Sequence, residues 1–185
     1  MNVIAFSGSL RSGSWNTRLI TEAVAGLTAR GVTVDLWDFR AAKVPIYDPD
    51  TSDTSPAPQV LDFKARVAKS HGVLISAPEY NYSISGALKN LLDYTSRPPK
   101  DNPFRGKVVA QLGATPGPGG TLQGQIMLRH VMVGLMAHSL PGAFTISKAA
   151  EAFDEQGHLK DETQKKNLGA LLDRFVDELK LRVSR

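Results

Sequence analysis

A loop that follows the first apolar run of the chain carries the side chains best suited to holding an anion. Residues 6–20 read FSGSLRSGSWNTRLI and offer the hydroxyls of Ser7, Ser9, Ser14 and Thr17, the amide of Asn16 and the positive charge of Arg11. Backbone N–H groups at a helix start also point at a bound anion, and each hydrogen bond to a charged group contributes about 1.5–3 kcal/mol. A helix cap beside a surface arginine needs only one such residue, so the pattern favours a phosphate site over a simple cap.

Two glycines in this loop restrict the kind of phosphate that it holds. Gly8 and Gly13 have the spacing of the nucleotide-hydrolase P-loop, but Ser14 and Trp15 stand where that loop requires a lysine and a magnesium-binding hydroxyl. Leu10 replaces the second glycine of the dinucleotide-binding fingerprint. The loop is therefore better suited to anchoring the terminal phosphate monoester of a cofactor than to transferring a phosphate.

The elements around this loop predict an α/β fold. Apolar runs at residues 2–7, 32–37, 72–78, 107–114 and 142–147 read as buried strands. Helical spacing of apolar residues appears at 16–30, around Val60 to Val67, at 85–94, at 121–137 and from Leu168 to Leu179. Such alternation predicts an open parallel sheet with helices on both faces. Ligands bind at the carboxyl edge of such a sheet, which carries a first loop (residues 7–17), a second loop (77–85) and a third loop (113–121).

Composition excludes several classes of protein. The chain has 185 residues and no cysteine, so we expect one domain over 1–185 and no disulfide, thiolate metal site or cysteine nucleophile. The four histidines show no metal-ligand spacing. A net charge of +4 favours anionic ligands but is too small and too scattered to indicate nucleic-acid binding. No signal peptide and no apolar stretch near about 20 residues is visible, so we expect no membrane segment and a cytoplasmic location.

The first two loops together resemble those of one family. The segments GSLRSGSWN (residues 8–16) and APEYNYSISGALKNLLDY (77–94) are similar to the signatures of NADPH-dependent FMN reductases, which include quinone, azo-dye and chromate reductases. The resemblance implies a flavodoxin-like fold with sheet order 2-1-3-4-5, non-covalent FMN, and homodimers or homotetramers. It also implies that the FMN phosphate is held by Ser9, Arg11, Ser14, Asn16 and Thr17.

The resemblance also assigns the other two loops to the isoalloxazine ring. Pro78, Glu79, Tyr80 and Asn81 would lie along it, and Thr115 stands where related chains often carry serine. Gly117 and Gly119 in the third loop allow close backbone approach, which suits hydrogen bonding to the N1/O2 edge. Taken singly, residues 79–81 also read as a turn and residues 113–121 as a loop without a ligand.

A flavin carries the redox chemistry itself, so no catalytic side chain is expected. We expect NADPH or NADH as the donor, stacked on the exposed flavin face and released before the acceptor binds, which gives ping-pong kinetics. Expected acceptors are quinones or similar small molecules, including anionic ones. Two alternatives stay open: a flavodoxin-like electron carrier, which the basic charge disfavours because such carriers are usually acidic, and a non-catalytic FMN-binding redox sensor.

Overall fold

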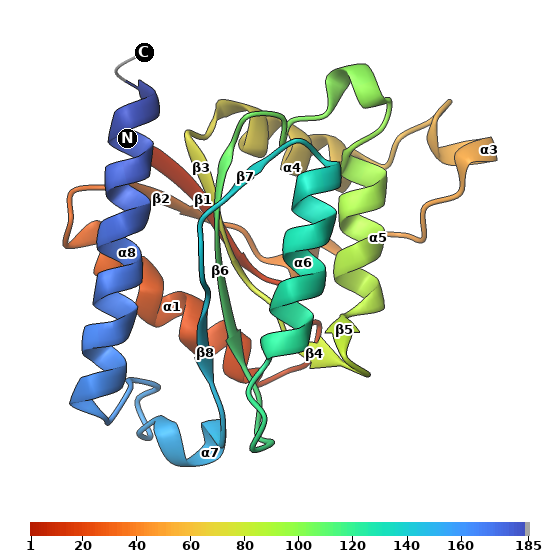
Figure 1. Cartoon of the computed structure of the whole chain (residues 1–185). Coiled ribbons are helices and arrows are strands. Elements are labelled where there is room, and N and C mark those ends of the chain that lie inside the picture. Colours follow the sequence, from red (N-terminus) through yellow and green to blue (C-terminus); the bar gives the residue numbers. More distant parts are fainter. Residues whose placement is uncertain (184–185) are drawn as a thin grey trace.

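A parallel sheet forms the centre of the molecule (Figure 1). A computed structural model describes residues 1–183 of the chain. The strands, in chain order, are β1 (Asn2–Ser7), β2 (Thr33–Leu36), β3 (Gly72–Ser76), β6 (Val108–Ala114), β7 (His138–Ser139) and β8 (Phe144–Ile146). They are ordered β2-β1-β3-β6-β7, with β8 pairing β6 farther along, and every pairing is parallel. This confirms the predicted order 2-1-3-4-5, the fifth position being shared by two short strands.

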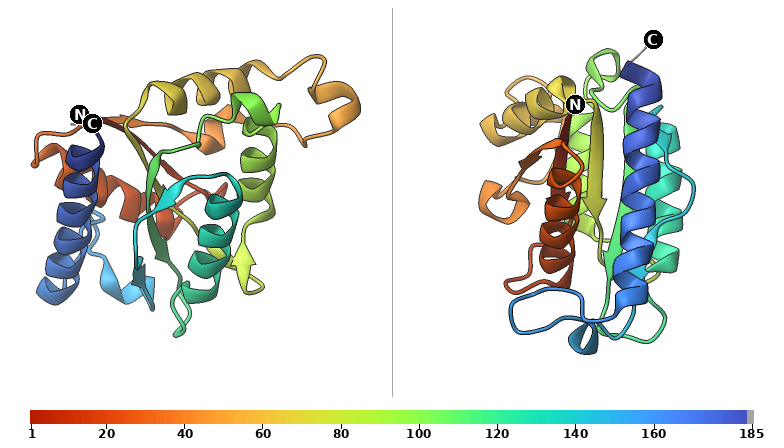
Figure 2. Two further views of the ribbon diagram at one scale, coloured as in Figure 1. Left: turned by 45° about the horizontal axis from the view of Figure 1, so that its top comes forward. Right: turned by 90° about the vertical axis from the view of Figure 1, so that its left-hand side faces the viewer.

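Helices cover both faces of the sheet, as Figures 1 and 2 show. On one face lie α1 (Trp15–Thr28) and α8 (Glu162–Val183), and on the other α4 (Pro58–Lys69), α5 (Gly86–Thr95) and α6 (Leu122–Gly134). Four single-turn elements occupy the connections: α2 (Phe39–Ala42), α3 (Pro49–Ser52), the 3₁₀ turn η1 (Pro99–Asp101) and α7 (Ala149–Ala152). The long helices thus lie where the apolar spacing predicts them.

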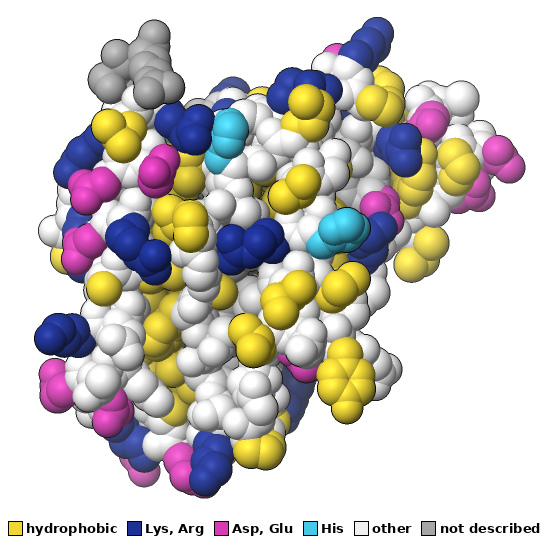
Figure 3. All heavy atoms as spheres, viewed as in Figure 1, with side chains coloured by type: hydrophobic (Ala, Val, Ile, Leu, Met, Phe, Trp, Pro, Cys, Tyr) yellow, Lys and Arg dark blue, Asp and Glu magenta, His cyan; other side chains and the backbone are white. Residues whose placement is uncertain are grey.

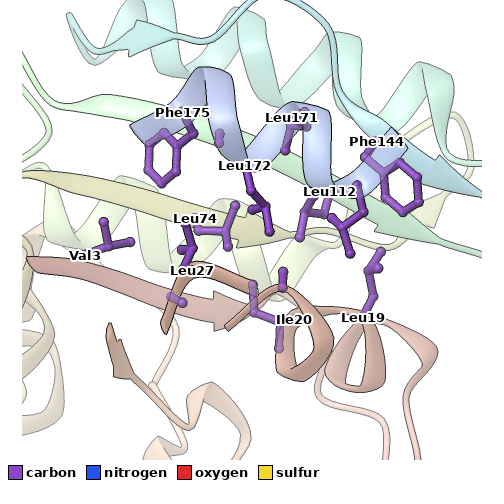
Figure 4. Close-up of a cluster of buried hydrophobic side chains, with 14 of the residues drawn as sticks. Val3, Leu19, Ile20, Leu27, Leu74, Leu112, Phe144, Leu171, Leu172 and Phe175 are labelled. Atoms are coloured by element: carbon purple, nitrogen blue, oxygen red, sulfur yellow. The ribbon is translucent and has the colours of Figure 1, made fainter. Parts of the chain in front are cut away.

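Successive side chains of a strand enter different cores. Val3 and Ala5 of β1 pack into the cluster beneath α1 and α8, whereas Ile4 and Phe6 pack into the cluster beneath α4, α5 and α6. Figure 4 shows the first cluster, in which leucines of α8 and α1 pack together with Val3, Leu74 and Leu112 of the strands. This two-sided burial explains why the strands are apolar without alternation.

Three connections differ from the sequence prediction. The second loop contains a small antiparallel hairpin, β4 (Glu79–Tyr80) and β5 (Ser83–Ile84), where a turn was expected. Residues 40–57, where the apolar pattern predicts no helix or strand, contain most of α2 and all of α3. The fifth strand, expected at 142–147, is divided because Pro141 has no N–H to donate and Gly142 takes φ +76°.

Candidate cofactor site

The three loops meet at the carboxyl edge of the sheet, at the lower edge of Figure 1. Residues from all three loops line one cavity. Eight of the twelve residues predicted for the site line it: Ser9, Arg11, Ser14, Asn16, Pro78, Glu79, Tyr80 and Thr115. Trp15, Ala114 and Pro116 complete the wall. The three loops therefore come together as the strand order predicts, and each contributes different groups to the cavity.

The first loop presents unpaired backbone donors. Gly13 takes φ +66°, and Ser14 caps α1 by accepting a hydrogen bond from the Asn16 backbone N–H at 3.2 Å. Within residues 1–183, the backbone N–H groups of residues 12–15 donate to no protein group. Arg11 is exposed and forms no ion pair with any described residue. A turn of free N–H groups beside a guanidinium is an anion-binding arrangement.

Close packing against α5 holds the first loop in place. The backbone N–H of Gly8 donates to the Ser76 carbonyl at 2.8 Å, and the Ser85 hydroxyl donates to the Gly8 carbonyl at 2.8 Å. A Cβ atom on Gly8 would lie only 2.7 Å from Leu88 Cδ2. Glycine is thus needed here for the approach of loop and helix. Ser85 is also the N-cap of α5, so the same hydroxyl caps this helix and holds the first loop against it.

Asn16 joins the first loop to the ends of two strands. It is buried, and its Oδ1 accepts hydrogen bonds from the Ser76 hydroxyl at 3.0 Å and the Ala114 backbone N–H at 2.9 Å. Its Nδ2 donates to the Ala114 carbonyl at 2.9 Å. These contacts make Asn16 a residue that positions the loops against each other. A direct contact between its side chain and phosphate stays a prediction.

The hairpin of the second loop forms another wall. Its turn residues Asn81 and Tyr82 have φ +50° and +64°, the left-handed geometry of a tight two-residue turn. Pro78 is buried, whereas Tyr80 is half exposed. The Glu79 carboxylate accepts a hydrogen bond from the Gly124 backbone N–H at 2.8 Å, which ties the hairpin to the start of α6. Asn81 lies at the turn and is not among the lining residues.

The third loop begins at Gly113 of β6, which packs closely against the start of α6. A Cβ atom on Gly113 would lie 1.9 Å from Thr121 Oγ1 and 2.4 Å from Gln125 Nε2. Farther along, the Thr115 hydroxyl accepts from the Gly117 backbone N–H at 3.3 Å. Gly117 and Gly119 lie outside the cavity wall. The Gly119 and Gly120 N–H groups donate to no group in the described part of the chain, so they remain available to a ligand.

Trp15 also lines the cavity, although the sequence pattern predicted no role for it in the site. Its ring stacks on Phe153 at a centroid distance of 5.9 Å, and the Arg18 guanidinium lies 4.8 Å from its centroid. The segment after α7 therefore supports the cavity wall. An aromatic residue at the first position of a helix was the available signal, but its stacking partner lies too far along the chain for sequence spacing to reveal it.

The arrangement fits a phosphate-bearing cofactor. The free N–H groups of residues 12–15 and Arg11 suit its phosphate, and residues of the hairpin and of the third loop line the same cavity. A model of the NADPH-dependent FMN reductase family matches residues 1–151. The chain belongs to this family. FMN and a nicotinamide donor, the cofactors expected from the resemblance, are those of the family.

Individual relatives agree with the family assignment. The chain is 41% identical over 163 residues to an NAD(P)H-dependent FMN reductase of Pseudomonas aeruginosa, covering 88% of this chain and 86% of that one. It is 30% identical over 182 residues to a quinone reductase of Pseudomonas putida, covering 97% and 95%. The solved structure of FerB, a flavoenzyme NAD(P)H:(acceptor) oxidoreductase from Paracoccus denitrificans, superposes with a TM-score of 0.83 at 29% identity over 97% of both chains.

Likeness in fold extends beyond the reductases. An archaeal flavodoxin superposes with a TM-score of 0.66 at 13% identity, covering 97% of this chain and 99% of the flavodoxin. That identity establishes the flavodoxin-like fold alone. Among residues 1–183, no group of three or more His, Asp or Glu side chains is placed to hold a metal ion.

Proposed function

We propose that this FMN reductase family member transfers reducing equivalents from NADPH or NADH to quinones or similar small acceptors. The observation that carries the proposal is the run of free backbone N–H groups at residues 12–15, of which Ser14 and Trp15 line the same cavity as Tyr80 and Pro116. FMN bound there supplies the redox chemistry by taking a hydride from the nicotinamide and passing the electrons on. The named relatives, an NAD(P)H-dependent FMN reductase and a quinone reductase, support the same donor and acceptor classes.

The protein's contribution is to bind and orient. In this proposal Ser9, Arg11, Ser14 and Thr17 hold the phosphate, and Asn16 fixes the loop that carries them. Pro78 to Asn81 lie along the ring, Thr115 forms part of its far wall, and free N–H groups of the third loop near Gly117 and Gly119 bind the edge that becomes negative. The Glu79 carboxylate accepts a hydrogen bond from the Gly124 N–H and so holds the hairpin against α6.

The finer features of the activity follow from one shared cofactor site. Donor and acceptor would use the cofactor site in turn, which gives ping-pong kinetics, and the proposed acceptors include azo dyes, chromate and free flavin as well as quinones. The net charge of +4 favours anionic acceptors. None of the helices in the described part of the chain has the length and apolar character needed to cross a bilayer. We place the protein, as one domain over 1–185, in the cytoplasm, without membrane or nucleic-acid partners.

A homodimer or homotetramer is part of the proposal. Apolar side chains are exposed on α6 and on the hairpin, including Leu122, Ile126, Val133 and Tyr82. Figure 3 shows apolar side chains gathered over these elements. Exposed patches of this kind are typical of protein–protein contacts. Light scattering after gel filtration measures the assembly; a monomer at micromolar concentration would contradict this part.

The visible spectrum of the purified protein tests the central proposal. We expect a bound-flavin spectrum, anaerobic bleaching by NADPH or NADH, and recovery of the colour when a quinone is added. A flavin that NAD(P)H does not bleach would indicate an electron carrier, and bleaching without turnover on any acceptor would indicate a redox sensor. A protein that stays colourless after FMN is added would overturn both the function and the site.

Arg11→Ala tests the phosphate cradle separately from the ring. Loss of a hydrogen bond to a charged group is expected to weaken FMN binding by about tenfold or more. Arg105→Ala is the control, because it removes the same charge at the opposite end of the sheet, just before β6. Equal FMN affinity of Arg11→Ala and wild type would contradict the phosphate role of Arg11.

A further inference from the structure

A second cavity adjoins the cofactor site at the carboxyl ends of β1 and β2, and we call it the β2 cavity. Its walls are Ser7 and Ser9 of the first loop, Thr17, Ile20 and Thr21 of α1, and residues 36–40, which end β2 and begin α2. Ser9 lines both cavities. The two cavities therefore meet at Ser9.

The size and lining of the β2 cavity suit part of a ligand. Its volume is about 200 Å³, below the about 300–1,000 Å³ of pockets that enclose a whole drug-sized ligand. Ile20, Trp37 and Phe39 are buried and give it an apolar floor, while the exposed side chain of Leu36 stands at its rim. Hydroxyls of Thr17 and Thr21 lie on the α1 side. An apolar floor with a few hydroxyls fits a flat heterocycle joined to a sugar.

Two charged residues complete the cavity. Arg40 is exposed and has no hydrogen bond or ion pair with any residue from 1 to 183. The Asp38 Oδ1 atom accepts a hydrogen bond from the Ala41 backbone N–H at 3.0 Å, and its second carboxylate oxygen has no donor among the described residues. In Rossmann-type dinucleotide sites, an acidic residue about 20 residues beyond the glycine-rich loop binds the adenosine ribose, and a nearby arginine accommodates the 2′-phosphate of NADP.

We propose that the β2 cavity binds the adenosine end of the nicotinamide dinucleotide, with Arg40 paired to the 2′-phosphate of NADPH. The inference rests on the proposed function, since it concerns the electron donor of the adjoining site. It also explains how a chain without a dinucleotide fingerprint recognises a dinucleotide. The first loop is taken by the FMN phosphate, so the donor is held at its adenosine end, beyond that loop. FAD carries an adenosine of the same chemistry, and the experiment must separate the two sources.

Filling the cavity is the first test, and α1 supplies a matched control. The Thr21 hydroxyl donates to the Thr17 carbonyl at 3.0 Å, and the Thr28 hydroxyl makes the same contact with Val24 at 2.9 Å, but only Thr21 lines the cavity. Thr21→Trp is expected to raise KM for NADPH and NADH by about tenfold, the effect of about 1.4 kcal/mol of lost binding. Reduced nicotinamide mononucleotide, which lacks the adenosine half, should be used as well as by wild type. Thr28→Trp should match wild type with all three donors.

Arg40→Ala tests the choice between donors. Without the guanidinium, KM for NADPH is expected to rise about tenfold while KM for NADH changes less than about twofold, because only NADPH carries the 2′-phosphate. Arg105→Ala, which removes an equal charge at the other end of the sheet, should change neither. An equal effect of Arg40→Ala on both donors would overturn the role given to Arg40.

Binding measurements keep this inference distinct from the proposed function. Calorimetry with adenosine 2′,5′-bisphosphate needs no turnover; wild type should bind it, and Thr21→Trp should not. If wild type binds no bisphosphate, or if Thr21→Trp uses NADPH normally, the cavity assignment is wrong even though the reductase activity stands. If the bisphosphate binds but NADPH does not bleach the flavin, the proposed function fails and the adenosine site remains. If Thr21→Trp weakens FAD relative to FMN and spares NADPH, the donor assignment is overturned in favour of the flavin.

Discussion

At the scale of single residues, the site depends on polar side chains that make their hydrogen bonds to other protein groups and not to a ligand. The amide of Asn16 satisfies both backbone groups of Ala114 and the hydroxyl of Ser76, all inside the protein. Buried backbone groups are costly to leave unpaired, so this one side chain fixes the distance between the first and third loops. The N–H groups of residues 12–15 can therefore stay without protein partners, because Asn16 makes the hydrogen bonds that hold the loop in place.

Asn16→Ala is predicted to damage both stability and cofactor binding. It leaves the Ala114 N–H and C=O groups without partners in a buried place, at a cost of about 1–3 kcal/mol for each unsatisfied group. We expect a lower free energy of unfolding in urea and weaker retention of FMN. Asn167→Ala, on the exposed surface of α8, is the control and should stay within about 0.5 kcal/mol of wild type. An Asn16→Ala protein as stable as this control would refute the positioning role.

Sequence patterns could predict which residues of the first loop are polar, but not which of them bond to the protein and which are left for a ligand. Ser14 was expected to cap a helix or to hold phosphate, and it does cap α1. Thr17 lines the β2 cavity and not the cofactor cavity, so its contact with the phosphate stays a prediction. Asn16 bonds to Ala114, 98 positions away. Such partners are set by strand order, which local spacing does not encode.

At the scale of elements, the hairpin and α6 depend on each other. Thr121 is the N-cap of α6 but makes no side-chain cap hydrogen bond, so the first turn has a free N–H that Glu79 takes up from β4. The negative carboxylate also lies favourably at the positive end of the helix. The glycine at 124 is part of this contact, since a Cβ atom there would lie 3.2 Å from Glu79 Cβ.

Glu79→Ala is predicted to loosen this junction without unfolding the protein. Loss of a helix cap costs about 0.5–2 kcal/mol, and the freed hairpin should also shift the absorption of the bound flavin or lower turnover. Glu79→Gln keeps an oxygen acceptor and should recover most of the stability. Glu155→Ala, an exposed glutamate with no hydrogen bond among the described side chains, serves as the control in urea unfolding. If the alanine and glutamine variants behave alike, the carboxylate does not cap α6.

The segment from 153 to 159 is a further element tied to α1. Phe153 pairs with Leu159, and His158 Nδ1 lies 2.8 Å from Glu22 Oε2 on α1. The hydrogen bond to Glu22 and its charge raise the pKa of His158 above its ordinary value; Asp154 acts in the same direction and Lys165 against it. Since this segment carries the ring that stacks on Trp15, its attachment bears on the wall of the site.

This pair predicts a small, signed pH dependence. A pKa raised in the folded state means that the stabilisation is fully present below the ordinary value of about 6.5 and is lost as pH rises through the raised value. The thermal midpoint of wild type should therefore exceed that of His158→Gln near pH 6 and converge with it by about pH 9. The difference should be small because the side chain is exposed. His130→Gln, a histidine without an ion pair among the described residues, should leave the pH profile unchanged. Parallel profiles for wild type and His158→Gln would show that the pair contributes nothing.

Elements with strong periodicity were predictable, and those made by few residues were not. The long helices and the buried strands follow from unbroken or helically spaced apolar runs. The hairpin was not predicted from the sequence, because its turn, Asn81–Tyr82, lacks the glycine that usually marks such a turn. A tyrosine takes the left-handed conformation there, at φ +64°. The β2 cavity was not predicted, because in the sequence Arg40 is a single cation in a polar connection and nothing marks it as part of a site. Only the fold brings it beside α1.

At the scale of the whole molecule, the folded domain extends beyond the residues that the family model matches. The family model ends at residue 151, whereas α8 runs from Glu162 to Val183. The buried face of α8 nevertheless supplies a large part of the core beneath α1 (Figure 4). Contact between the two helices is close: a Cβ atom on Gly26 of α1 would lie 2.6 Å from Leu172 Cδ1. The carboxyl-terminal helix is therefore part of the body that positions the first loop.

Two leucines of α8 test this dependence. Leu172 is 1% exposed and Leu181 is 59% exposed, so the same substitution samples the core and the surface of one helix. Leu172→Ala is expected to lower the free energy of unfolding by about 2–5 kcal/mol, whereas Leu181→Ala should change it by less than about 0.5 kcal/mol. Because the lost contact supports α1, Leu172→Ala should also release FMN at a lower urea concentration than Leu181→Ala. Similar unfolding midpoints for the two variants would mean that α8 lies on the sheet without stabilising it, and that residues 1–151 hold the site unaided.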